Sequence, residues 1–174
     1  METPSALDEA RVVVAGATAL GRAPDADVVA RLVCGRVRPD GGVSDPGFSE
    51  ECAVAAAAAL LRWANPRSPA LDRLGRWMEL RAFERPPAHL ELLAWLTSGL
   101  AATGRRYPDP AGARAMLDGC ARRLPPRRRG GGGFARATLM GIATLEYTYL
   151  AARTAVLLGP HAVDSSPWRE PYAW

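Results

Sequence analysis

Arg38-Pro39-Asp40-Gly41-Gly42 opens the stretch that decides the fold, and the apolar run Cys52-Ala-Val-Ala-Ala-Ala-Ala-Ala-Leu-Leu-Arg-Trp63 closes it. Pro39 fixes its own φ, and Gly41 and Gly42 can adopt positive φ without a steric penalty, so we expect the chain to reverse there. The run that follows consists of good helix formers and has almost no polar face. The stretch therefore predicts a turn that leads into a buried helix.

Length and composition indicate one domain over residues 1–174. The chain has 48% hydrophobic residues, enough for a core of its own. Three cysteines, Cys34, Cys52 and Cys120, form no CxxC pair, which argues against a disulfide framework and favours a reducing compartment such as the cytoplasm. The apolar run 12–20 lacks the basic flank of a signal peptide and is too short for a membrane span.

The formal net charge of +4 comes from arginine, because the chain contains no lysine. The complete replacement of lysine by arginine, together with the many Ala, Gly and Pro residues, is typical of a coding bias in the genome. We therefore do not expect nucleic acid as a partner, since no interleaved aromatic residues accompany the charge.

Amphipathic and apolar segments alternate along the chain. After a first helix from about 5 to 20, amphipathic outer helices are predicted to begin near 27, 69 and 110, the last with an apolar stripe that reaches Leu124. Apolar inner helices follow at 52–63, 90–100 and about 138–158. This rhythm predicts an all-α fold of about seven helices, built from helical hairpins at 25–65, 69–104 and 109–159. An irregular aromatic tail, 160–174, would cover an open edge or dock on a partner.

Two segments resemble the repeats of the prenyltransferase and squalene-cyclase (terpenoid cyclase) family. They are Pro39-Asp-Gly-Gly-Val-Ser-Asp-Pro-Gly-Phe-Ser-Glu50, before the alanine-rich helix, and Gly132-Gly-Phe134, before Leu145-Glu-Tyr-Thr-Tyr-Leu-Ala-Ala-Arg-Thr-Ala-Val-Leu-Leu-Gly159. The likeness covers about 25–159. It implies an α/α toroid whose inner helices line a cavity for an isoprenoid. The chain has about half the helices of a full toroid, so we expect a homodimer, a partner subunit, or a tail that shields the open ends.

The resemblance also implies a zinc site. Family members with prenyltransferase activity hold zinc with an Asp and a Cys at the start of one inner helix and a His on the next. Glu50, Cys52 and His89 stand at or near those positions. Zinc with an open coordination position would activate a thiol. The alternative is structural: Glu50 favours the helix N-terminus, Cys52 is a small buried residue, and His89 begins a helix.

Further candidates lie on the apolar helices and on one basic turn. Glu146, if buried, would need a partner such as Arg153 or a raised pKa, and is the candidate for acid–base catalysis or for pairing at a hairpin contact. Arg127, Arg128 and Arg129 could hold a diphosphate or remain a solvated turn. Asp25 and Asp27 are expected to cap a helix rather than protonate a substrate. The candidate aromatic ligand-binding side chains are Trp63, Trp95, Tyr147 and Tyr149.

Three functional hypotheses follow. The first is a prenyltransferase- or cyclase-like subunit that binds an isoprenoid in a cavity between the three inner helices. The second is a scaffold that kept the repeats but has a filled core and an exposed protein-binding edge. The third is a small zinc-dependent enzyme. The size of the inner cavity distinguishes the first two, and metal content tests the third.

Overall fold

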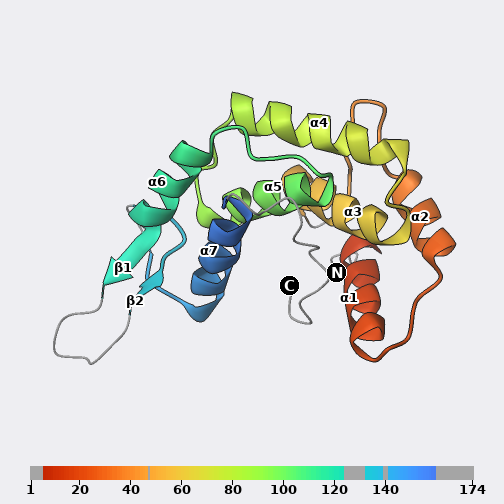
Figure 1. Cartoon of the computed structure of the whole chain (residues 1–174), viewed down its shortest axis with the longest axis horizontal. Coiled ribbons are helices and arrows are strands. Elements are labelled where there is room, and N and C mark those ends of the chain that lie inside the picture. The colour runs from red at the N-terminus through yellow and green to blue at the C-terminus, as the bar shows by residue number, and fades with distance from the viewer. Residues whose placement is uncertain (1–5, 47, 124–131, 139–140, 160–174) are drawn as a thin grey trace.

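The computed structural model describes residues 6–46, 48–123, 132–138 and 141–159. Seven helices and one short pair of strands make up the regular structure of these residues (Figure 1). The predicted all-α class and the predicted number of helices are therefore confirmed. The helices are α1 (Ala6–Ala19), α2 (Ala26–Cys34), α3 (Glu50–Ala64), α4 (Pro69–Glu84), α5 (Leu90–Ala102), α6 (Pro110–Cys120) and α7 (Leu145–Leu157).

Local capping and turn signals place the first pair of helices. Asp25 caps α2, because its Oδ1 accepts hydrogen bonds from the backbone N–H groups of Asp27 and Val28 at 2.9 and 3.1 Å. The predicted turn is confirmed by a bridge between Val37 and Val43 and by the positive φ of Gly41, +90°. Gly41 lies so close to the backbone of α4 that a Cβ atom there would overlap a carbonyl oxygen. The turn thus holds α4 against the start of α3.

The helices form an inner row and an outer row. In the inner row α5 lies between α3 and α7 (Figure 1). Every residue of α3 from 52 to 61 is buried. In the outer row α2 packs on α3, α4 packs on both α3 and α5, and α6 packs on both α5 and α7. The predicted alternation of outer and inner helices is therefore seen in space. Closure into a toroid remains a prediction.

The third pair departs from the sequence prediction at both of its helices. α6 ends at Cys120 instead of reaching Leu124, because β1 (Ala121–Arg123) pairs in antiparallel register with β2 (Gly132–Phe134). α7 begins at Leu145 rather than near 138, since Phe134 also bridges to Thr144 and the Thr144 side chain caps the helix by accepting from the Tyr147 N–H at 3.1 Å. Extended backbone replaces what was expected to be helix.

α7 occupies the predicted inner position, but it is less buried than α3 and α5. Within α7 only Ala151 and Thr154 are buried, whereas Leu145 and Val156 are exposed. The reason is positional, because α7 is the last described helix of the row and no described helix packs on its outer side.

In the described part of the chain no helix combines the length and the apolar character that crossing a bilayer requires.

Candidate functional site

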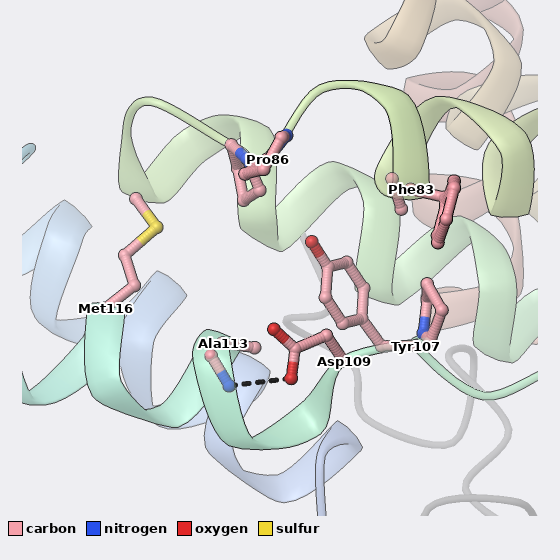
Figure 2. Close-up of a pocket in the computed structure, with 10 residues that line it drawn as sticks. Phe83, Pro86, Tyr107, Asp109, Ala113 and Met116 are labelled. Carbon is pink, nitrogen blue, oxygen red and sulfur yellow. Dashed lines mark hydrogen bonds between the residues drawn. The ribbon is translucent and has the colours of Figure 1, made fainter.

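A pocket of about 400 Å³ opens between the end of α4, the connection from α4 to α5, and the start of α6 (Figure 2). Its walls come from two proline-containing connections and from two helices. Most of the lining is apolar or aromatic. The lining residues are Ala82, Phe83, Pro86, Pro87, Tyr107, Pro108, Asp109, Gly112, Ala113 and Met116.

The prolines explain why a space remains there. α4 ends at Glu84, and Pro86 and Pro87 cannot continue it because they lack a backbone N–H and restrict the residue before them. α6 begins at Pro110 with Asp109 as its N-cap, whose Oδ1 accepts a hydrogen bond from the Gly112 N–H at 2.9 Å. Both connections are therefore held in fixed, extended shapes beside the helices, and they form stiff apolar walls.

Tyr107 is the polar group buried deepest in this lining, with 9% of the residue exposed. Burial raises the pKa of its phenol to about 12, and the negative charge of Asp109 adds to the effect. Its hydroxyl makes no hydrogen bond to any described residue. In Figure 2 the ring stands between Asp109 and Pro86, with its hydroxyl end on the Pro86 side. Tyr107 therefore offers a permanently protonated donor to the pocket.

The charge of the pocket is negative. Among its described lining residues Asp109 is the one with a formal charge, and none is an arginine. The first N–H groups of a helix ordinarily favour an anion. Here the Asp109 carboxylate already occupies that position through its bond to Gly112. The lining accordingly suits an uncharged apolar molecule.

The three predicted zinc ligands are not brought together. Glu50 forms an ion pair with Arg38, Cys52 is buried in α3, and His89 caps α5, where its Nδ1 accepts a hydrogen bond from the Leu92 N–H at 3.3 Å. Among the described residues no group of three or more His, Cys, Asp or Glu side chains is arranged to hold a metal ion. The roles that the structure gives Glu50, Cys52 and His89 are those of the structural alternative.

A small cavity lies next to α1, among described residues of α1, α3 and α5. Its volume is about 10 Å³, close to that of one water molecule, and Cys52 and Trp95 line it together with side chains of α1. The Arg11 guanidinium lies over the Trp95 ring, 5.6 Å from its centroid. Trp63, near the end of α3, is half-buried against the core. At this point the inner wall is filled by protein.

The remaining candidates are dispersed. Glu146 is exposed in the first turn of α7, so it is not the buried carboxyl that was considered as a catalytic acid. Tyr147 is half-buried, and its hydroxyl donates a hydrogen bond to Glu91 Oε1 at 3.1 Å, while Arg136 pairs with the other oxygen of Glu91. Tyr149 is half-buried on the same helix. Arg127, Arg128, Arg129 and the tail 160–174 lie outside the described residues.

Sequence reasoning missed the pocket residues Phe83, Tyr107, Asp109 and Met116. The available signal was the pair of proline clusters, Pro86-Pro87 and Pro108-Asp109-Pro110, which mark two stiff connections. Only the packing of α4 and α6 on the same inner helix, α5, brings those connections together.

Comparison of the chain with models of protein families, with curated proteins and with solved structures finds no match. The candidate site is therefore argued from its own geometry.

One prediction concerns the pair Glu51–Arg81, which joins α3 to α4 beside the predicted zinc ligands. Glu51 Oε1 accepts a hydrogen bond from Arg81 Nε at 2.7 Å. Burial raises the pKa of Glu51, but its backbone hydrogen bond and Arg81 outweigh burial, so the pKa is lowered overall. The pair therefore stabilises the fold above the unfolded-state pKa of Glu, about 4.3, and its contribution is lost as pH falls through the folded-state value.

We expect Glu51→Gln to lower the free energy of unfolding by about 1 kcal/mol at pH 7, and by less at pH 3. Urea unfolding at both pH values measures the difference. Glu84→Gln, at an exposed position of α4, is the matched control and should keep the wild-type pH dependence. A loss for Glu51→Gln that is equal at the two pH values would contradict the prediction.

Proposed function

We propose that the protein is a helical-hairpin repeat protein that binds a small apolar molecule in the pocket between α4 and α6. The observation that carries the proposal is the pocket itself, about 400 Å³ with a mostly apolar lining that includes the buried Tyr107. Ligand sites in proteins commonly measure roughly 300–1,000 Å³ and combine apolar walls with a few polar groups. This pocket has both properties.

An isoprenoid is the ligand class that we propose first, because the repeats resemble the prenyltransferase and terpenoid cyclase family. The proposal differs from that resemblance in position, since the inner cavity beside Cys52 and Trp95 has room for about one water molecule. It assigns binding and no reaction. The candidate acid Glu146 is exposed, and the candidate zinc ligands have structural partners, so neither supports a catalytic step.

A second candidate function, a scaffold that associates through its last repeat, is favoured by the open side of α7. Leu145 is 87% exposed and Val156 is 65% exposed, and Ile142 before the helix is exposed as well. Repeat arrays bury such faces against the next repeat or against a partner. We propose that a second copy or a partner subunit covers this face, with the cytoplasm as the expected location.

The ligand proposal predicts that Phe83→Ala weakens binding without unfolding the protein. Phe83 lines the pocket but is 80% exposed, so its removal costs little folding energy. We expect farnesene, a neutral isoprenoid hydrocarbon, to raise the melting temperature of the wild type. Loss of part of the apolar contact should weaken its Kd about fivefold, as measured by isothermal titration calorimetry.

The matched control is Leu80→Ala, which removes an exposed apolar side chain from the same helix outside the pocket lining. It should bind farnesene as the wild type does. Equal weakening in both variants would place the hydrocarbon elsewhere, and no binding to the wild type would refute the ligand proposal.

The association proposal predicts that Leu145→Glu shifts the protein toward the monomer. An acidic residue in the first turn of α7 suits the helix dipole, so the helix should persist while its apolar face is interrupted. Light scattering during size-exclusion chromatography over a range of concentrations measures the mass. Leu20→Glu, at an exposed apolar position just after α1, is the control. A wild type that is monomeric at every concentration and captures no partner subunit would refute the proposal.

A further inference from the structure

We infer that the pocket selects an uncharged ligand that carries an oxygen acceptor, and that it discriminates against prenyl diphosphates. The inference rests on the proposed function, because it names the ligand chemistry of the same pocket. It is carried by the hydroxyl of the buried Tyr107, which faces the pocket, and by the carboxylate of Asp109.

The hydroxyl of Tyr107 is available to a ligand. Tyr107 as a whole is about nine-tenths buried, and none of the described residues forms a hydrogen bond with its hydroxyl. The ring is what is buried, because the hydroxyl oxygen is not one of the fully buried side-chain atoms that lack a partner, so it can be reached from the pocket. The hydroxyl end of the ring lies at the pocket, between α6 and the connection that contains Pro86 (Figure 2). A ligand atom in the pocket can complete this hydrogen bond.

The phenol proton calls for an acceptor on the ligand. The phenol is protonated at physiological pH, and burial raises its pKa further, to about 12, so Tyr107 has a proton to donate and a ligand oxygen can accept it. Alcohol, ether and carbonyl oxygens satisfy this requirement. A pure hydrocarbon fills the apolar lining but leaves the hydroxyl without a partner.

The charge distribution excludes an anionic head group. Asp109 brings a negative charge to the lining, and no arginine among the described lining residues offsets it. The N-terminus of α6 would otherwise attract a phosphate, but its Gly112 N–H already donates to Asp109 Oδ1 at 2.9 Å. A diphosphate in this pocket would lose its hydration and meet a like charge. An alcohol avoids both costs, and its own proton suits a carboxylate acceptor.

Three probes that share one prenyl chain test the inference: farnesene, farnesol and farnesyl diphosphate, each titrated calorimetrically into the full chain. For the wild type we expect farnesol to bind about fivefold more tightly than farnesene, because its oxygen accepts one hydrogen bond from Tyr107. We expect the diphosphate to bind more weakly than farnesol. Tyr107→Phe should remove the advantage of farnesol without weakening the binding of farnesene.

Asp109→Asn tests the charge, because asparagine is also a good N-cap and should preserve α6. We expect Asp109→Asn to strengthen the binding of farnesyl diphosphate and so to reduce the difference in affinity between the diphosphate and farnesol. The comparison among the three probes on the wild type requires no variant, so it decides the question even if Tyr107→Phe is unstable.

The outcomes separate the inference from the proposed function. If none of the three probes binds, the proposed function fails. If farnesene binds but farnesol binds no more tightly, or if Tyr107→Phe retains the preference for farnesol, the inference is overturned while the apolar site stands. Diphosphate binding tighter than that of farnesol would overturn it as well.

Discussion

The fold depends on the close approach of α3 and α5 where Ala55 faces Gly99. A Cβ atom on Gly99 would lie 3.0 Å from Ala55 Cα and 3.1 Å from Ala55 Cβ, and it would also overlap the sulfur of Met78 on α4. Three helices therefore meet at a point where one of them has no side chain. The consecutive alanines of α3 have small side chains, so a neighbouring helix can approach α3 closely. Close-packed interiors leave no room for an additional carbon atom. This contact allows α3 and α5 to be buried together.

The position of the pocket depends on this contact, because α4 packs on the two helices that it joins. α4 packs across both α3 and α5, and α6 packs on α5 and α7, so two successive outer helices share α5 as their support. Proline-containing connections follow α4 and precede α6, and the pocket lies between them (Figure 2). This pocket lies at the seam between outer helices, and α1 packs against α3 beside the small inner cavity. A larger site inside the row of inner helices stays a prediction.

Features that depend on local pattern could be predicted, and features that depend on contacts between distant segments could not. The apolar runs at 52–61 and 90–100 indicated buried helices because no polar face interrupts them, and the glycine turn at 41–42 indicated a reversal of the chain. The late start of α7 was missed because a bridge from Phe134 to Thr144 holds the preceding residues extended. The pocket was missed because Phe83 and Tyr107 meet only through tertiary packing.

The absence of a side chain at Gly99 sets the distance between the inner helices α3 and α5. The most direct measurement is the free energy of unfolding of Gly99→Ala compared with that of Gly16→Ala, both in urea. Gly16 lies in α1, where an added Cβ atom would meet nothing within 4 Å, so alanine there should stabilise the protein by about 0.5–1 kcal/mol through helix propensity alone. We expect Gly99→Ala instead to destabilise the protein by about 1–3 kcal/mol, because the added methyl group overpacks the contact. Equal stabilisation by both substitutions would show that Gly99 does not set the helix spacing.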